Sequence, residues 1–250
     1  MIECKDVSVS ISSRKIIERF NARFENGTVT SVLGKNGCGK TTLLKAISGI
    51  CRSDGFIDID GKPLTEYKKN DLSKVISLMP QVLSRPSITV NKLVEYGRSP
   101  YTGLGGILSA RDREVVKEAV EKCEIRHLIS KTIDGISGGE QRKAFFAMLV
   151  AQDTHNVLLD EPLANLDAEY SHKLIGLINE LKLQNKAIIA VFHDINIALE
   201  HSDRLIFIDN GKCIFSGTPS DAVKEKIPEN LFGMKKISYT ENYTEKYFYR

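Results

Sequence analysis

Residues 34–41 read GKNGCGKT, and this glycine-rich stretch, here called the phosphate loop, decides the fold. It follows the short apolar run TVTSVL and precedes TTLLKAISGI, a sequence that predicts a helix. The loop matches G-x-x-x-x-G-K-[ST], a pattern whose glycines let successive backbone N–H groups surround phosphate oxygens. We therefore expect a nucleotide to contact Gly34, Lys35, Asn36, Gly37, Cys38, Gly39, Lys40, Thr41 and Thr42.

Two side chains of the phosphate loop have expected roles in the chemistry. Lys40 should reach the β- and γ-phosphates, and the Thr41 hydroxyl should bind Mg²⁺. The helix that follows points its positive end at the phosphates. Cys38 also stands inside the loop, where oxidation would block nucleotide binding. A small residue that is tolerated at this position is the simpler interpretation.

A pair of carboxylates follows a second apolar run, in the stretch NVLLDEP at residues 156–162. Two acidic side chains at the end of a buried strand are costly unless a cation or a substrate uses them. Taken alone, the pair could equally be an acidic turn. Beside a phosphate loop, Asp160 is expected to organise Mg²⁺, and Glu161 to polarise or deprotonate the attacking water.

Two further polar residues follow strands that should end at the same edge of the sheet. His193 comes after AIIAVF at residues 187–192, and Gln81 comes after a predicted strand at 75–80. A lone histidine in this position is more often packed or capping, and a lone glutamine is more often a solvated loop residue. The position of His193, parallel to that of Asp160, favours contact with the γ-phosphate.

The composition is that of an ordinary globular chain. Its 250 residues are 42% hydrophobic and 27% charged, and a net charge of +3 is too small to argue for nucleic-acid binding. No apolar run approaches the roughly 20 residues that span a bilayer, and no secretory signal pattern is present at the N-terminus. Five cysteines without a Cys-x-x-Cys pair argue against a disulfide framework or a zinc site, and favour a reducing cytosol.

Strands alternate with helices along most of the chain, which predicts a mostly parallel sheet with helices on both faces. The first sixty residues are rich in alternating, strand-like segments such as KDVSVSI and GFIDIDGKPL. Residues 86–150 have helical spacing instead. We expect one domain over residues 1–250, in which 1–85 and 151–250 form the nucleotide-binding core and 86–150 form a helical subdomain.

Residues 136–140 read ISGGE, a second glycine-rich loop that a single nucleotide site does not need. With this loop included, the chain resembles the nucleotide-binding subunit of ABC transporters over about residues 1–235. The phosphate loop is similar to the Walker A motif, ISGGEQ to the signature motif, and VLLDEP to the Walker B motif with its catalytic glutamate. Gln81 stands where the family has its Q-loop glutamine, ANLD resembles the D-loop with Asp167, and His193 resembles the H-loop histidine.

This resemblance implies a fold and an assembly. The implied fold is α/β: a P-loop NTPase core with a mostly parallel sheet, an N-terminal antiparallel β-subdomain and an inserted α-helical subdomain. The family's second glycine loop binds ATP that the partner chain holds, which implies a homodimer. The implied contacts to the partner's ATP are made by Ser137, Gly138, Gly139 and Glu140.

The resemblance also implies the reaction and its cofactors. ATP and Mg²⁺ are the implied cofactors, with Thr41, Gln81 and Asp160 around the metal. Hydrolysis of ATP to ADP and phosphate is implied to use Glu161, His193 and Lys40 as the catalytic residues.

The chain departs from the family pattern at several positions. The signature motif begins with Ile136 instead of leucine, a conservative change. Leu163 and Ala164 remove hydroxyl groups at the D-loop and so change its hydrogen bonding. The family usually stacks an aromatic side chain on adenine near residue 11. Because Ile11 stands there, we expect an aliphatic contact to the base.

The stretch after the Q-loop resembles one branch of the family, the importers of iron(III)-siderophores, heme and vitamin B12. In that branch V-x-x-G-R-x-P-[YH] follows the Q-loop, as VEYGRSPY does here. This implies a peripheral subunit on the cytoplasmic face of the cell membrane, which powers import of iron-siderophores or related chelates. Its implied partners are integral-membrane permease subunits and, indirectly, an extracytoplasmic substrate-binding protein. Residues 96–101 are then expected near the permease, with an ordinary surface turn as the alternative.

Two other classes of function remain open from the sequence. A soluble ABC ATPase of an assembly machine, such as one for Fe–S cluster biogenesis, would share every nucleotide motif without needing a permease. The importer-like residues 96–101 argue against it. A non-hydrolysing nucleotide switch or scaffold is the other class, and the presence of Glu161 and His193 argues against that.

Overall fold

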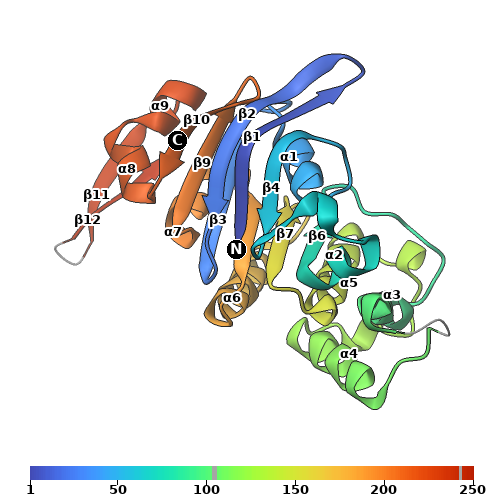
Figure 1. Cartoon of the computed structure of the whole chain (residues 1–250). Coiled ribbons are helices and arrows are strands. Elements are labelled where there is room, and N and C mark those ends of the chain that lie inside the picture. The colour runs from blue at the N-terminus through green and yellow to red at the C-terminus, as the bar shows by residue number, and fades with distance from the viewer. Residues whose placement is uncertain (103–105, 242–243) are drawn as a thin grey trace.

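The computed structural model describes residues 1–102, 106–241 and 244–250 (Figure 1). Residues 103–105, in the segment that resembles the importer branch, and 242–243, in the tail, lie outside the described residues. Two sheets occupy the middle of the molecule. The helices between the sixth and seventh strands gather at one end, and the elements that close the chain lie at the other (Figure 1).

A six-stranded sheet forms the centre of the fold, with the strand order β10-β9-β3-β8-β7-β6. Neighbouring strands are parallel except β9 and β10, which form an antiparallel hairpin. The strands are β3 (Thr28–Gly34), β6 (Ile76–Met79), β7 (Asn156–Asp160), β8 (Ala187–Val191), β9 (Arg204–Asp209) and β10 (Lys212–Gly217). Every residue of β7 and β8 is buried, as expected for parallel strands that are covered on both faces.

An antiparallel sheet of strand order β2-β1-β4-β5 carries the N-terminal part of the chain. A tight turn connects β1 and β2 through Ser12 and Ser13, whose φ angles are 46° and 66°. The Glu18 N–H on β2 donates to the carbonyl of Gly211 at 2.9 Å, which joins this sheet to the β9–β10 turn. The strands are β1 (Ile2–Ile11), β2 (Arg14–Phe24), β4 (Asp54–Ile59) and β5 (Lys62–Pro63).

The central sheet separates two apolar clusters. On one face, helix α1 (Lys40–Ile47) and the antiparallel sheet bury Leu43 and Phe20 in the same cluster as Leu158 of β7. On the other face, helices cover Leu159, the next residue along β7. Because successive side chains of a strand point to opposite faces, one strand serves both clusters and is held between them.

The helical end of the molecule is built from elements between β4 and β7 (Figure 1). Helices α4 and α5 begin at Ser109 and Ser137, and each serine forms a capping box with the acidic residue three positions later. The helices are α2 (Lys69–Val75), α3 (Val90–Tyr96), α4 (Ala110–Lys122) and α5 (Gly138–Gln152). Short 3₁₀ turns cover Leu64–Glu66, Ser99–Tyr101, Arg126–Leu128 and Ile133–Gly135.

A buried ion pair fastens these helices together. Arg98 Nε donates to Asp112 Oδ1 at 2.9 Å, and the two side chains are only 8% and 9% exposed. A second nitrogen of Arg98 donates to the carbonyl of Ala151 at the end of α5. The Ser109 hydroxyl, followed by Arg98, holds the pKa of Asp112 below its usual range. One guanidinium therefore connects the segment after α3 to both α4 and α5.

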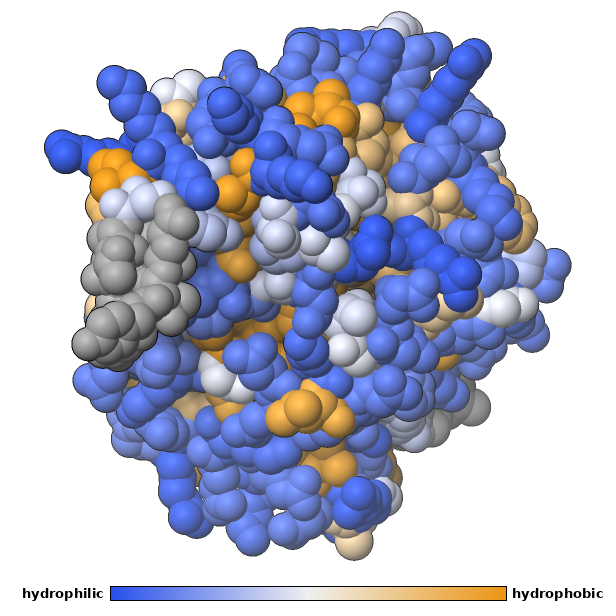
Figure 2. Space-filling model, turned by 90° about the vertical axis from the view of Figure 1, so that its left-hand side faces the viewer, coloured by the Kyte–Doolittle hydropathy of each residue, from blue (hydrophilic) through white to orange (hydrophobic). Residues whose placement is uncertain are grey.

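The C-terminal third returns to the sheet and then leaves it. Its elements are α6 (Ala168–Leu183), α7 (Ile195–His201), α8 (Pro219–Lys224), α9 (Ile227–Phe232), β11 (Lys236–Glu241) and β12 (Thr244–Tyr249). Asn196 of α7 clasps the hairpin, since its amide donates to Tyr249 O at 3.1 Å and accepts from Tyr249 N at 2.7 Å. The face on this side is mostly hydrophilic, with apolar side chains in small separate patches (Figure 2).

The predicted fold class is confirmed: the chain is α/β, with a mostly parallel sheet and helices packed on it. One predicted strand needs correction, because β6 ends at Met79 and Gln81 lies two residues past it, exposed. Helix α9 and the β11–β12 hairpin fall in a tail where no motif indicated them. The division of the chain at residues 86 and 150 stays a prediction.

Candidate nucleotide site

The carboxyl ends of the parallel strands meet at one edge of the central sheet and bring distant residues together. The phosphate loop follows β3, Gln81 follows β6, Asp160 ends β7 and His193 follows β8. A cavity of about 380 Å³ opens at this edge. It is lined by Ile16, Asn36, Gly37, Gly39, Lys40, Thr41, Thr42, Gln81, Glu161 and His193.

Glycine is required at both ends of the phosphate loop. A Cβ atom at Gly34 would lie 2.2 Å from the carbonyl oxygen of Ile208, too close for any side chain. Gly39 has a φ of 109° in the left-handed region, and a Cβ there would lie 2.6 Å from Ile17 Cδ1. The loop is therefore wedged between β2 and β9, which holds its backbone at the N-terminus of α1.

The Lys40 side chain lies inside the phosphate loop. Its ammonium donates to the carbonyls of Gly34 at 2.7 Å and Lys35 at 3.0 Å. The thiol of Cys38 is 3.9 Å from the same nitrogen and is buried. Burial raises the pKa of Cys38 despite the opposing charge of Lys40, which disfavours the reactive thiolate. Cys38 fits the interpretation of a small packed residue.

Asp160 is the candidate ligand for a divalent cation. Its side chain is 2% exposed, and its Oδ1 has no hydrogen-bond partner among the described residues. Burial raises the pKa of Asp160, whereas a hydrogen bond from the Thr41 hydroxyl lowers it. Mg²⁺ usually binds one or two protein oxygens and takes its other ligands from phosphates and water. A free, buried carboxylate oxygen beside a threonine hydroxyl fits that ion.

Glu161 lies at the centre of a hydrogen-bonded cluster. Its Oε1 accepts from Gln81 Nε2 at 2.6 Å and lies 2.6 Å from His193 Nε2. The carboxylate side chain is 12% exposed, whereas that of His193 is 53% exposed. Gln81 uses its amide nitrogen in this contact, so its amide oxygen stays available for the predicted Mg²⁺ contact. The structure thus brings three predicted site residues into direct contact.

Arg142 of α5 was missed in the sequence and lies beside this cluster. Its guanidinium donates to the carbonyl of Glu161 at 2.7 Å and to the carbonyl of Gln81 at 3.1 Å. The sequence signal was weak, because Arg142 stands in a run of mixed polar residues directly after the second glycine loop. Its partners are main-chain atoms of distant segments, which only the fold brings near.

The second glycine loop does not line the phosphate cavity of its own chain. Ser137 and Glu140 cap α5, with Glu140 accepting from Ser137 N at 2.8 Å, and this bond lowers the pKa of Glu140. A Cβ at Gly139 would lie 3.0 Å from the carbonyl of Asn165. A Cβ at Gly138 would meet no atom within 4 Å. The fold of the single chain therefore does not require glycine at position 138.

The predicted D-loop, residues 164–167, lies between β7 and α6 in the chain, and its Asn165 approaches Gly139 of the second glycine loop. Asp167 caps α6, since its Oδ1 accepts from Tyr170 N at 2.7 Å. Leu163 and Ala164 line a cavity of about 150 Å³ that also touches Glu161 and His193. The two residues that lack hydroxyl groups thus contribute an apolar wall beside Glu161 and His193.

The aliphatic residue that lines the cavity is Ile16, whereas the sequence had pointed to Ile11 for a contact to the base. Ile11 ends β1, is 52% exposed and does not line the cavity. The turn at residues 12–13 reverses the chain, and only further along β2 does Ile16 reach Gly39 and the cavity. Which residue contacts the base therefore stays a prediction, and the aliphatic side chain that lines the cavity is Ile16.

The segment 96–101 is half buried, and so it differs from an ordinary surface turn. Arg98 and Pro100 are buried, and the Tyr101 hydroxyl donates to the carbonyl of Gln152 at 2.9 Å. The side chains of Tyr96 and Tyr101 are nevertheless 49% and 38% exposed. The segment is a fixed platform that presents aromatic side chains.

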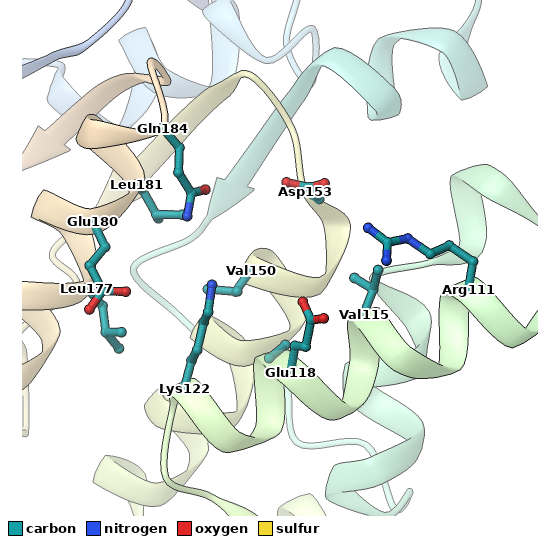
Figure 3. Close-up of a pocket in the computed structure, with 11 residues that line it drawn as sticks. Arg111, Val115, Glu118, Lys122, Val150, Asp153, Leu177, Glu180, Leu181 and Gln184 are labelled. Carbon is teal, nitrogen blue, oxygen red and sulfur yellow. The ribbon is translucent and has the colours of Figure 1, made fainter.

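A separate cavity of about 210 Å³ lies between α4 and α6 and shares no residue with the phosphate cavity (Figure 3). Arg111, Glu118 and Lys122 on α4 approach it from one side, and Glu180 and Gln184 on α6 from the other. Its charges are mixed and mostly open to solvent.

Of the helices in the described part of the chain, none has the length and apolar character of a membrane span.

Comparison with known proteins identifies relatives of the chain. The family described as ABC transporter matches residues 17–164. A petrobactin import ATP-binding protein of Bacillus subtilis is 33% identical over 94% of this chain and 93% of its own length. A hemin import ATP-binding protein of Aliivibrio fischeri is 33% identical over 94% of this chain and 92% of its own. An iron(3+)-hydroxamate import ATP-binding protein of Bacillus subtilis is 32% identical over 98% and 92%.

Solved structures share the fold at lower identity. An ATP-binding subunit of an ABC transporter superposes with a TM-score of 0.82 at 21% identity, over 93% of this chain and 98% of that one. A dimeric ATP-binding cassette bound to ADP and Pi superposes with a TM-score of 0.78 at 23% identity, over 88% of this chain and 99% of that one.

Proposed function

This chain belongs to the ABC transporter family as an ATP-binding ATPase, and from that premise we propose that it hydrolyses Mg-ATP as a homodimer to power an importer of iron chelates. The observation that carries the proposal is the meeting of Lys40, Glu161 and His193 around one cavity. These three residues are far apart in the sequence and come from three different segments. A cavity with these three side chains suits phosphate binding and activation of water.

Each side chain has a distinct task in this proposal. Lys40 exchanges the carbonyls of the phosphate loop for oxygens of the β- and γ-phosphates, and the N-terminus of α1 adds its backbone N–H groups. Glu161 accepts the proton of the attacking water. His193, already within hydrogen-bond distance of Glu161, holds the γ-phosphate in line with that water.

Mg²⁺ would be held by Asp160 and Thr41, with the amide oxygen of Gln81 close by. When bound, it supplies positive charge against the developing charge of the transferred phosphoryl group. The raised pKa of Asp160 supports this role, because the charge of a buried carboxylate whose Oδ1 has no partner among the described residues is costly until a cation approaches it.

The dimer is proposed from the position of the second glycine loop. Ser137, Gly138 and Gly139 stand at the N-terminus of a 15-residue helix, where backbone N–H groups favour an anion. They do not line their own chain's phosphate cavity, and position 138 is open. A γ-phosphate held by a second copy of the chain is the partner that we propose for this loop, with Glu140 keeping Ser137 in its cap.

The cargo class is proposed from the relatives. The petrobactin, hydroxamate and hemin import proteins match this chain over nearly its full length. The exposed rings of Tyr96 and Tyr101 on their buried platform provide a surface for permease subunits. An extracytoplasmic binding protein would then deliver an iron chelate to the permease, and this chain would remain at the cytoplasmic face.

The ATPase part is tested by phosphate release from Mg-ATP, with native chain and with Glu161→Gln. We expect turnover by the native chain and a loss of at least about a hundredfold in the variant. Equal turnover by the two proteins would remove Glu161 from the mechanism.

The importer part is tested separately by isolating the tagged chain from detergent-solubilised membranes of its own source. Mass spectrometry should identify an integral-membrane permease among the bound proteins. Recovery of soluble assembly proteins alone would leave the ATPase intact and overturn the import role.

A further inference from the structure

Arg142 is a buried cation for which the steps proposed above have no use. It lies on α5, five residues after Ser137, and the whole residue is 4% exposed. Its Nε has no hydrogen-bond partner among the described residues. Burial lowers the pKa of Arg142, while the charges of Glu161 and Asp160 oppose that shift. A buried cation is costly unless its position serves the fold or the site.

The two terminal nitrogens of the guanidinium donate hydrogen bonds to two main-chain carbonyls. One nitrogen donates to Glu161 O at 2.7 Å, and the other donates to Gln81 O at 3.1 Å. The side chains of these two residues also meet, at 2.6 Å between Gln81 Nε2 and Glu161 Oε1. Because the guanidinium is planar and rigid, it fixes the spacing of the two main chains as well.

The backbone of Glu161 needs such support. Its φ is 54°, in the left-handed region that residues with a Cβ seldom adopt. Such a conformation persists only where the surrounding structure holds it in place. The Glu161 N–H donates to Val191 O at 3.1 Å, so the backbone of Glu161 is held from β8 at its N–H and from α5 at its carbonyl.

We propose that Arg142 is a positioning residue for hydrolysis: it holds the main chains of Glu161 and Gln81 in register and ties both to the helix that begins with Ser137 and Gly138. This role rests on the proposed ATPase function. Arg142 is not among the residues that line the phosphate cavity. It acts through the direction of the Glu161 carboxylate, so its loss changes the rate of the chemical step and leaves nucleotide binding to the phosphate loop.

The test compares Arg142→Met and Arg142→Lys in the full-length chain. We expect Arg142→Met to lower kcat between tenfold and a hundredfold, since displacement of a catalytic group by about 1 Å can cost a hundredfold. The KM for ATP and the Kd for Mg-ADP should stay within about twofold of native. Arg142→Lys should recover part of kcat, because an ammonium can reach a carbonyl but lacks the planar fork.

The matched control is Arg111→Met, on the exposed side of α4 at the rim of the cavity in Figure 3. It should leave kcat and KM at native values. If Arg142→Met does not fold, Arg142→Gln, which keeps amide donors, replaces it beside Arg142→Lys.

Two results would overturn the proposal. One is native kcat in a folded Arg142→Met chain, and the other is an equal loss of kcat and of Mg-ADP affinity, which would mark a purely structural role. Failure of the proposed function is distinguishable from both, because the native chain itself would then release no phosphate.

Discussion

Gln81 Nε2 donates to Glu161 Oε1 at 2.6 Å, although the two residues are 80 positions apart. His193 Nε2 lies 2.6 Å from the same oxygen. The carboxylate proposed to activate water is therefore held from two neighbouring strand ends. We expect nucleotide binding to replace some of these contacts, and occupation of the site would then be felt by the loop that carries Gln81.

The substitution Glu161→Gln should separate ATP binding from hydrolysis. It removes the base but keeps a side chain of the same size that can still bond to Gln81. We expect phosphate release to fall by at least about a hundredfold, while Mg-ATP shifts the chain to a dimer in size-exclusion chromatography. Glu169→Gln, at an exposed position of α6, is the control and should hydrolyse ATP normally. Normal turnover by Glu161→Gln would refute the assignment.

Gly138→Ala should leave the free chain stable and stop hydrolysis. No atom lies within 4 Å of the new Cβ, and alanine favours a helix over glycine by up to about 1 kcal/mol. A phosphate from the partner would meet the methyl group. Gly176→Ala, in the middle of α6 and equally uncrowded, is the matched control. Thermal unfolding should show no loss in either variant, and only Gly138→Ala should lose ATPase activity.

Mixed dimers test whether the site is shared between chains. Lys40→Ala disables one chain's phosphate loop, and Gly138→Asp disables the other chain's second glycine loop. Each variant alone should be inactive, but a mixture should recover activity, because one of the two sites then combines an intact phosphate loop with an intact second loop. No recovery from dimers that do form would contradict the head-to-tail arrangement.

Asp160→Asn should stabilise the metal-free chain at neutral pH. The raised pKa of Asp160 means that the folded chain binds this proton more tightly than the unfolded chain, so stability falls as pH rises through the folded value. The variant should unfold at a higher temperature than native at pH 7.5, by roughly 2–4 °C for each kcal/mol gained. The difference should shrink as the pH is lowered through the folded pKa toward the usual pKa of an aspartate.

Mg-ATP should reverse this order in thermal unfolding. It should stabilise the native chain and have little effect on Asp160→Asn. Asp71→Asn, which changes an exposed carboxylate on α2, provides the baseline, since such surface ion pairs contribute about 0–1 kcal/mol. A native chain that Mg-ATP stabilises no more than Asp160→Asn would argue against Asp160 as a metal ligand.

Arg98→Met should destabilise the helical end of the molecule by about 3 kcal/mol, because it leaves the Asp112 carboxylate buried without its cation. The pKa of Asp112 is lowered in the fold, so its stabilising effect is present above its usual pKa and is lost as pH falls through the folded value. Urea unfolding at pH 7 and at acid pH measures the loss of stability in the variant and its dependence on pH. Arg113→Met changes an exposed position of α4, the helix that carries Asp112, and should change the free energy of unfolding little.

The sequence could predict the residues whose partners are close in the chain or are phosphates. The phosphate loop, Asp160 and Glu161 follow apolar strands, and parallel strands end at one edge of a sheet, so their meeting could be foreseen. The Arg142 contacts could not, because they join a helix side chain to main-chain carbonyls of Gln81 and Glu161, whose positions depend on the whole packing of α5 against the sheet.

Position along a strand was the other limit. The expectation of an aliphatic residue near the base pointed to Ile11, but the chain turns at Ser12 and Ser13, and it is Ile16 that lines the cavity. The C-terminal hairpin could not be predicted from the sequence for a related reason. Its attachment depends on the amide of Asn196 pairing with the backbone of Tyr249, and asparagine in a helix carries no signal of that use.

The clasp between Asn196 and Tyr249 decides where an optical reporter can be attached. Asn196 stands three residues after His193, so a fluorophore at residue 249 or 250 would disturb the helix that follows this predicted catalytic residue. Leu183, at the end of α6, is 84% exposed, so a label attached there should disturb the structure less. The native cysteines are buried or half-buried, so a thiol-directed dye on Leu183→Cys would label mainly the introduced residue.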